Sequence, residues 1–357
     1  MVTESMTSSK KHCVLVFPAN GCMGYDMCRE LCEGAKKEHL EEVYAVCCSS
    51  EGKWVDKLKD LGKKCKVICL DKPTDMDCWK KHVTRKVDCM MLCTDPSAMR
   101  HMKSKVAEDY ADMAKAMECA VEMCHHLNCK CMVETTAYCA DDSKYKMWHR
   151  IHQCIEMAAE KHFKGHCCVM YHNMMFECIM TNREELRQEK KLSWPVSPNA
   201  ECCPMSMCDM ACCCIEGMRE CMKEMDSGSA SGVMASVMQS TGMGAASKKH
   251  MKYHLTGKDM MTPQMMMDMM SQNLGQAYSY QQVDENQWKQ MVQNHMGMME
   301  IEMMMECFRM MDDGKMKHCT HDMKKLCDRE PMNMADWIRK HQAEFGPGAS
   351  AQSSMMM

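Results

Sequence analysis

The sequence predicts an α/β fold, a doubly wound parallel sheet followed by a smaller, mainly helical C-terminal domain. Short apolar runs alternate with amphipathic helical segments six times in about the first 170 residues, which is typical of parallel strands joined by helices. The first run ends in a small glycine-containing turn directly before a helix. Beyond residue 180 this alternation stops. We therefore expect a sheet domain over 12–180, to which later segments return, and a second domain over 181–345.

The predicted strands are built on short apolar runs, because helices cover both faces of such a sheet. Between them lie segments with apolar residues at three- and four-residue spacing, which predicts helices that pack one face on the sheet. The predicted strands cover 14–17, 42–48, 64–71, 87–93, 129–135 and 166–171, and the predicted helices cover 25–36, 54–61, 74–83, 107–127 and 148–161.

The second half of the chain begins with a proline-punctuated, irregular segment at 192–204. A strand at 252–257 runs into a turn. In the helix that follows, Thr262 is the expected N-cap, Pro263 the first residue and Gly275 the stop. Segment 226–249 lacks periodicity and predicts a flexible insertion, and the tail 346–357 predicts disorder. The other predicted helical segments are 182–191, which is charge-rich and solvated, 206–223, 287–311 and 321–345.

Charge and hydropathy exclude several classes of protein. The net charge of −4 in 357 residues gives no electrostatic reason for contact with nucleic acid or a membrane surface. No apolar run has the length of a bilayer span, and the N-terminus lacks a signal-peptide pattern. We expect a soluble cytoplasmic protein, with the nucleus as a second location.

Sulfur-containing residues are unusually abundant: the chain has 52 Met and 30 Cys but only 5 Phe. Most occur where an apolar residue is expected, so they stand in for Leu, Ile, Val and Phe in the core. A disulfide framework is not expected in a chain of this size and class. Two dense Cys clusters, at 124–131 and 202–221, lack the paired Cys-x-x-Cys spacing of zinc modules, so no metal site is predicted.

The glycine-containing turn after the first strand predicts a phosphate site. Glycines there let backbone N–H groups approach a pyrophosphate, which rests at the positive end of the next helix. Gly21 and Gly24 supply the last two glycines of such a pattern, and Pro18 occupies the place of the first. The turn residues predicted to bind a dinucleotide are Pro18, Asn20, Gly21, Cys22, Met23 and Gly24.

Polar residues at the ends of the other predicted strands extend this site, because ligands bind at the carboxyl ends of the strands in such folds. Asp71 accepts a hydrogen bond from an adenine amino group in one interpretation, and is a solvated carboxylate capping a turn in the other. The further candidates are Thr94, Asp95 and Pro96 after the fourth strand and Thr135 and Thr136 at the end of the fifth.

The segment after the second strand bears on the choice between NADP and NAD. The 2′-phosphate of NADP needs a cation there, usually Arg, and the NAD ribose needs an acidic residue at the strand tip. Neither residue is present. The hydroxyls of Ser49 and Ser50, together with Lys53, favour NADP slightly.

In its order of elements and in four motifs, the chain resembles the NmrA-like family, an atypical branch of the short-chain dehydrogenase/reductase superfamily with a Rossmann domain. Residues 18–24 are similar to the family's Gly-Ala-Thr-Gly-x-x-Gly, and 87–96, 192–198 and 253–257 are similar to later family segments. The resemblance implies a dinucleotide-binding domain and a smaller domain with a cleft between them. Some members reduce carbonyl or quinone compounds with NADPH, and others bind the dinucleotide and a protein partner without known turnover.

The sequence lacks one catalytic motif of the superfamily that it resembles. Reductases of the superfamily use a Tyr-x-x-x-Lys pair, in which the phenol is the acid and the ammonium lowers its pKa. No such pair occurs, and His152 falls near the place of the lysine, with Trp148 near its partner. A neutral imidazole binds a ribose hydroxyl but supplies no fixed charge at pH 7. Alternatively, both residues simply face the cleft or the core. Tyr171 and Asn173 fall where the family places substrate-facing residues.

Three hypotheses about function follow. The first is an NAD(P)-binding redox sensor that regulates a protein partner with little or no turnover. The second is an NAD(P)H-dependent reductase of small carbonyl or quinone compounds, with His152 or a water as the proton source. The third is a scaffold that no longer binds a dinucleotide, because Pro18 removes a backbone donor.

Overall fold

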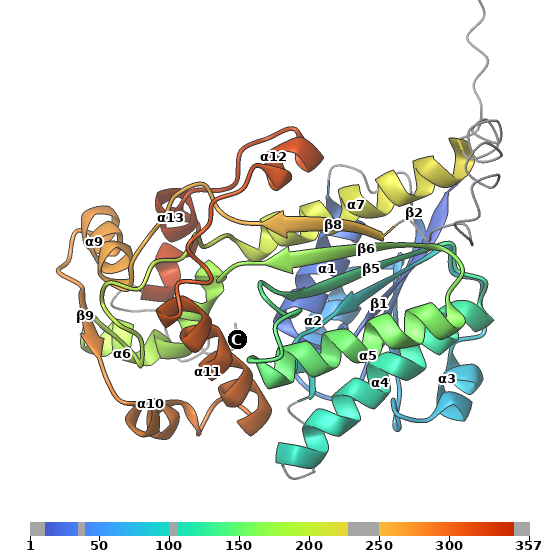
Figure 1. The fold of residues 1–357 in the computed structure, drawn as a ribbon, viewed down its shortest axis with the longest axis horizontal. Coiled ribbons are helices and arrows are strands. Elements are labelled where there is room, and N and C mark those ends of the chain that lie inside the picture. Colours follow the sequence, from blue (N-terminus) through green and yellow to red (C-terminus); the bar gives the residue numbers. More distant parts are fainter. Residues whose placement is uncertain (1–10, 35–39, 100–105, 228–249, 346–357) are drawn as a thin grey trace, which may run out of the picture.

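The computed structural model describes residues 11–34, 40–99, 106–227 and 250–345. Its centre is a seven-stranded sheet in the order β3-β2-β1-β4-β5-β6-β8, with every pair parallel (Figure 1). The predicted doubly wound parallel sheet is therefore confirmed. Its strands are β1 (His12–Phe17), β2 (Leu40–Cys47), β3 (Cys65–Cys69), β4 (Cys89–Cys93), β5 (Cys131–Ala137), β6 (His166–His172) and β8 (His250–Leu255).

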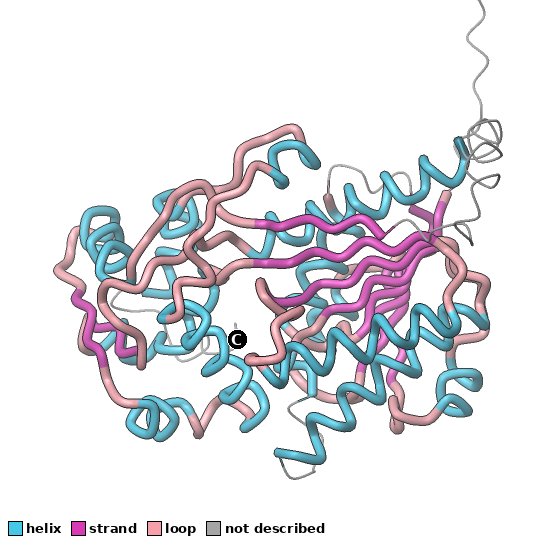
Figure 2. The backbone as a smooth tube through the Cα atoms, in the orientation of Figure 1, coloured by secondary structure: helices cyan, strands magenta, loops and turns pink. Residues whose placement is uncertain are grey.

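Helices cover both faces of the sheet, which is why the central strands β1 and β4 are mainly apolar. In Figure 2 the helices, in cyan, flank the magenta strands. One face packs against α1 (Cys22–Glu33), α2 (Lys53–Asp60) and α7 (Met207–Ser227). The other packs against α3 (Met76–His82), α4 (Val106–His126) and α5 (Lys146–His162).

Methionine and cysteine fill the core, as the composition predicts. All five residues of β4 are buried, and four of them are Cys or Met. Cys89 and Met91 pack in the layer beneath α1 and α7, whereas Met90 packs in the layer beneath α4 and α5. Strand β4 thus presents sulfur-containing side chains to both layers, where most proteins have Leu, Ile or Val.

Beyond β6 the chain builds a mainly helical part next to the carboxyl ends of the strands (Figure 1). Glu306 joins it to the sheet domain, because its carboxylate accepts hydrogen bonds from the first N–H groups of α5, that of Met147 at 3.1 Å. The elements of the helical part are η3 (Phe176–Asn182), α6 (Arg183–Gln188), β7 (Lys191–Trp194), α9 (Pro263–Leu274), β9 (Ser279–Gln282), α10 (Glu285–Val292), α11 (Met298–Asp312), α12 (Asp322–Cys327) and α13 (Met334–Phe345). In the sheet domain, a short helix η2 (Pro96–Met99) follows β4.

The structure differs from the sequence expectation at several elements. The irregular segment 192–204 begins inside β7, which pairs in parallel with β9, and neither strand was predicted. The helical segments 287–311 and 321–345 each divide into two helices, with Gly297 and Pro331 in the breaks. The first helix begins at Cys22 rather than at residue 25. By contrast, α9 confirms its prediction: Thr262 Oγ1 accepts a hydrogen bond from the Met265 N–H, and Gly275 ends it with φ +68°.

The predicted insertion 226–249 lies outside the described residues apart from 226 and 227, and the tail 346–357 lies wholly outside them. None of the helices in the described ranges has the length and hydropathy needed to cross a bilayer. A disulfide framework was not expected, and the structure has one disulfide. It joins Cys203 and Cys319, 116 residues apart, and the other 28 cysteines form no disulfide. Sequence gave no sign of this pair, because it joins two loops brought together only by the fold.

Candidate functional site

The turn after β1 is fixed by a buried asparagine. The Asn20 Nδ2 donates to the Ala98 carbonyl at 2.8 Å, and its Oδ1 accepts from the Cys48 N–H at 2.9 Å. The side chain therefore ties this turn to the segments that follow β2 and β4. Asn20 was predicted to contact a dinucleotide directly. In the structure its polar atoms hold the three loops at the sheet edge together.

The protein's own atoms leave no room for a side chain at Gly21 or at Gly24. A Cβ at Gly21 would lie 2.2 Å from Asp95 Oδ2, and a Cβ at Gly24 would lie 2.2 Å from the Pro18 carbonyl oxygen. The sequence interpretation gave a different reason, namely room for a pyrophosphate. Both glycines thus permit close packing inside the turn, and their contact with a pyrophosphate stays a prediction.

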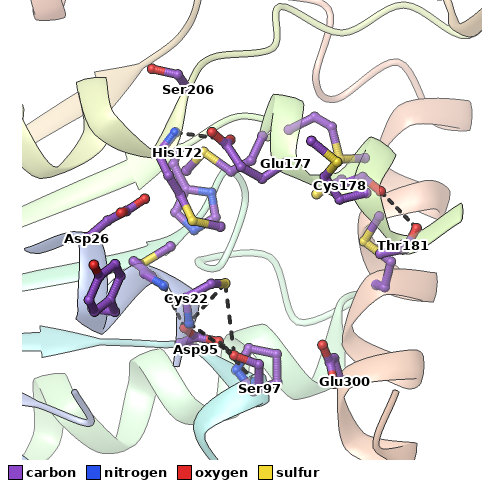
Figure 3. A pocket seen from close by; sticks show the side chains of 18 of the residues that line it. Cys22, Asp26, Asp95, Ser97, His172, Glu177, Cys178, Thr181, Ser206 and Glu300 are labelled. Carbon is purple, nitrogen blue, oxygen red and sulfur yellow. Dashed lines mark hydrogen bonds between the residues drawn. The ribbon is translucent and has the colours of Figure 1, made fainter. Parts of the chain in front are cut away.

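The first amides of α1 already have an anionic partner (Figure 3). The Met23 N–H donates to Asp95 Oδ2 at 2.9 Å, and the Cys22 N–H donates to Ser97 Oγ at 3.4 Å. The Ser97 hydroxyl in turn donates to Asp95 Oδ1 at 2.6 Å. These are the groups at a helix N-terminus that hold a pyrophosphate in folds of this kind. A buried carboxylate, 4% exposed, lies there instead.

Sequence reasoning identified Asp95 but missed Ser97 and the role that the two residues share. The available signal was the pattern Asp-Pro-Ser directly after β4, since Asp and Ser side chains commonly bond to nearby backbone groups in turns. What the pattern does not reveal is the partner. The bonds reach Cys22 and Met23, more than 70 residues earlier in the chain.

A cavity of about 300 Å³ opens between this turn and the helical part. Its wall is mainly apolar and rich in sulfur, and α1, α11 and α13 contribute to it along with loops at the carboxyl ends of the strands. The helical part contributes, among others, Met180, Met296, Met303, Met304, Cys307 and Trp337. Six of the predicted site residues line it: Cys22, Met23, Thr94, Asp95, Pro96 and Asn173.

The other predicted residues lie outside this lining. Asp71 is exposed, and the Ser49 hydroxyl bonds to the Glu51 backbone at 3.0 Å. The Thr135 hydroxyl is buried against Met23 Sδ at 3.1 Å, and the Lys53 ammonium lies over the Trp54 ring. The predicted site residues that lie outside the cavity lining are Pro18, Asn20, Gly21, Gly24, Ser49, Ser50, Lys53, Asp71, Thr135, Thr136, His152 and Tyr171.

Among the titratable side chains of the cavity wall that were not in the predicted site, His172 and Glu177 have strongly shifted pKa values. Burial lowers the pKa of His172 to about 4, so its imidazole is neutral at pH 7. Its Nδ1 donates to the Asn173 carbonyl at 3.1 Å, which leaves Nε2 as a buried acceptor without a partner among the described residues. Glu177 faces the cavity from η3 (Figure 3), and burial raises its pKa to about 7. Hydrogen bonds from Trp337 Nε1 at 3.0 Å and the Met207 N–H at 3.1 Å oppose that rise.

His152, the predicted catalytic residue, lies on the α5 side of the sheet and not in the cavity wall. Its Nδ1 contacts the Glu134 carboxylate at 2.7 Å, and both side chains are 2% exposed. Its Nε2 lies 3.1 Å from both Asp141 Oδ1 and Tyr171 Oη. The Lys252 ammonium donates to the same phenol oxygen at 3.1 Å. Folding thus brings His152 and Tyr171 together, as parts of one ion-pair network.

The charges of this network differ from the sequence expectation. Burial acts against a charged His152, but Glu134, Glu156 and Asp141 together raise its pKa to about 9. The imidazole is therefore a cation at pH 7, and the expectation of a neutral ring is wrong. Burial and Asp141 raise the pKa of Tyr171. A phenol with a raised pKa beside a lysine is not the activated acid of a reductase.

The sequence matches no protein-family model and no curated protein. Among solved structures, a nucleoside-diphosphate-sugar epimerase from Staphylococcus aureus is similar over 92% of this chain and 99% of that chain, with a TM-score of 0.65 and 14% identity. The NADPH complex of a quinone oxidoreductase from Escherichia coli matches with a TM-score of 0.64, and the NADP(H) complex of a Citrobacter sp. triphenylmethane reductase with 0.63. Both are 12% identical, over 92% of this chain and 99% of theirs.

At these identities the likeness concerns the fold. It covers the helical C-terminal part as well as the sheet, since nearly the full length of each neighbour is matched. The neighbours are epimerases and reductases whose structures include complexes with NADPH, NADP(H) and NAD. This chain therefore has a Rossmann fold with a helical C-terminal part.

Proposed function

We propose that this protein binds NADP or NAD at the carboxyl edge of the sheet and regulates a protein partner with little or no turnover, as a member of the NmrA-like branch. The cavity supports this proposal by its position, next to the α1 N-terminus and the ends of β4 and β6. The reductases that share the fold were solved with NADPH or NADP(H) in place. The slight preference for NADP comes from Ser49, Ser50 and Lys53.

The observation that supports the low-turnover part is the position of His152, the predicted proton source, and of Tyr171, the phenol that it contacts. His152 and Tyr171 bond to Glu134, Asp141 and Lys252 outside the cavity wall. Within the wall, His172 offers a lone pair and not a proton, which leaves Glu177 as the acid considered for the second candidate function below. A carbonyl reduction needs a proton donor beside the reacting oxygen, and general acid catalysis contributes about 10²–10⁴-fold to such rates.

Asp95 bears on the binding itself. A dinucleotide pyrophosphate would compete with this carboxylate for the Met23 N–H, so we expect weak binding accompanied by movement of Asp95. If Asp95 keeps its place against every dinucleotide, the protein is the non-binding scaffold.

A titration under reducing conditions tests the proposal. A ligand that binds only the native state raises the melting temperature by mass action. We expect millimolar NADP or NAD to raise it, and NADPH to be consumed at no more than the background rate with a panel of quinones and aldehydes. No rise with either dinucleotide, in wild type and in Asp95→Asn, would contradict dinucleotide binding.

A reductase is the second candidate, because Glu177 faces the cavity with a pKa of about 7. A carboxyl group with that pKa is half protonated at neutral pH and can serve as a general acid. In this case NADPH oxidation by a quinone would be measurable and would fall at least about 100-fold in Glu177→Gln. His152→Gln would leave the rate of the folded enzyme unchanged, since that side chain lies outside the cavity wall.

A further inference from the structure

Two cysteines of α7 differ from the core thiols around them. Cys208 and Cys212 are one helical turn apart on the same face and are partly exposed, whereas Cys213, Cys214 and Cys221 on the same helix are buried. Because they are partly exposed, Cys208 and Cys212 do not simply replace Leu or Val in the core.

A carboxylate from the neighbouring helix meets this thiol pair. Glu30 lies on α1, which packs directly against α7, and its Oε1 is 3.4 Å from Cys208 Sγ. One oxygen of Glu30 and the two sulfur atoms all lie within 4.8 Å of one another. Two packed helices therefore hold two thiols and a carboxylate around one point.

The geometry of α7 disfavours a disulfide between Cys208 and Cys212. Side chains four residues apart on a helix have Cβ atoms about 5–6 Å apart, whereas a disulfide needs about 3.5–4.5 Å. A third atom bonded to both sulfurs spans the pair without unwinding the turn. Zinc–sulfur bonds of about 2.3 Å place two thiolates of a tetrahedral site just under 4 Å apart, which fits this spacing.

We propose that Glu30, Cys208 and Cys212 form a binding site for a thiophilic divalent cation of the Zn²⁺ type, with water as the fourth ligand. Binding would release the thiol protons, because the thiolate is the metal ligand. Cys208 also lines the cavity proposed for the dinucleotide, so the two sites adjoin, but metal binding does not require a bound dinucleotide.

The surrounding charges are compatible with the proposal. Arg29 lies 3.3 Å from Glu30, and an incoming cation would displace it, but Arg29 keeps its 2.9 Å ion pair with Asp26. Arg329 is held by Asp209 at 2.7 Å and also contacts Cys212, so it would turn away from that sulfur when a cation binds. The other group of candidate ligands, around His152, contains no thiol, and the Lys252 ammonium lies 3.7 Å from Asp141 and 3.8 Å from Glu156.

Cobalt is a suitable probe, because tetrahedral Co²⁺ bound to thiolates gives intense visible and charge-transfer bands. We would titrate the full chain with Co²⁺ under a phosphine reductant and then displace the cobalt with Zn²⁺. We expect one equivalent bound in wild type, at least tenfold weaker binding in Cys208→Ser and in Cys212→Ser, and loss of the bands in the double variant. Glu30→Gln should weaken binding about tenfold while the sulfur bands remain.

The matched control is Cys154→Ser, which removes a partly exposed thiol on α5 and should bind cobalt as wild type does. Circular dichroism and the urea midpoint establish that each variant is folded. Absence of the bands in wild type would overturn the proposal. So would bands of equal strength in the folded Cys208→Ser/Cys212→Ser variant, because the metal would then be bound by other cysteines.

Discussion

Asp95 is the residue that the proposed dinucleotide would have to displace from the start of α1. Its carboxylate satisfies the Met23 amide and fixes Ser97, so the α1 N-terminus is stable without a ligand. A negative charge near the N-terminus of a helix stabilises the folded protein by roughly 0.3–1 kcal/mol. The same charge opposes an incoming pyrophosphate.

We predict that Asp95→Asn binds NADP more tightly than wild type does, by about tenfold. The amide keeps the shape of the side chain and removes a like charge beside the phosphate, and about 1–2 kcal/mol is the expected size of such a repulsion at a partly screened site. Isothermal titration calorimetry measures the change. Asp268→Asn, at an exposed carboxylate on α9, is the control. Weaker binding in Asp95→Asn would show that the carboxylate helps to hold the ligand, while dinucleotide binding itself would stand.

A second prediction concerns Glu177. Its pKa of about 7 is above that of an unfolded glutamate, so the native state holds the proton more tightly. The free energy of unfolding should therefore fall as the pH rises from about 4.5 to 7, by about 1–3 kcal/mol from this group. Urea denaturation of wild type and Glu177→Gln at both pH values isolates the contribution. The exposed Glu51→Gln should behave as wild type does, and an unchanged pH dependence in Glu177→Gln would refute the assignment.

At the scale of elements, the Glu134–His152 pair joins β5 to α5. Both side chains are buried, so removing one partner takes away the closest countercharge of the other, at a cost of up to about 3–5 kcal/mol, although His152 keeps Asp141 at 3.1 Å. We predict that His152→Gln and Glu134→Gln are each strongly destabilised and that the double variant loses less than the sum. A double-mutant cycle in urea at pH 7 measures this coupling.

The same pair has a defined pH dependence. Because the pKa of His152 is raised to about 9 in the native state, its stabilising contribution is complete below about pH 6.5 and is lost as the pH rises through 9. The coupling measured at pH 10 should therefore be smaller than that at pH 7. An equal coupling at both pH values would mean that the imidazole is not charged in the native state.

Apolar runs made the central sheet predictable, because a strand buried on both faces must be apolar throughout. The pair β7–β9 was not predictable on that ground. Each strand has four residues, and Ser279–Gln282 offers no apolar run. Similarly, the sequence places Asp95 after a strand and His152 on a helix, but it does not tell which neighbours their side chains contact. Asp95 meets an amide 72 residues away, and His152 a carboxylate 18 residues away.

At the scale of the whole molecule, thiol chemistry provides a direct test. Among the 30 cysteines only Cys203 and Cys319 are paired, and most of the others are buried. We predict few reactive thiols in the native protein, and 28 in the denatured protein before reduction against 30 after it. A colorimetric thiol reagent gives all three counts. Thirty thiols without reduction would show that the pair is open.

The strand order has a consequence for synthesis on the ribosome. β8 pairs with β6 along its length, yet some eighty residues separate the two strands in the chain. Until residue 255 has left the exit tunnel, the growing chain presents β6 as an open sheet edge, and such edges pair readily with other chains. The nascent protein therefore depends on its own late segment, or on a chaperone, to cover that edge in time.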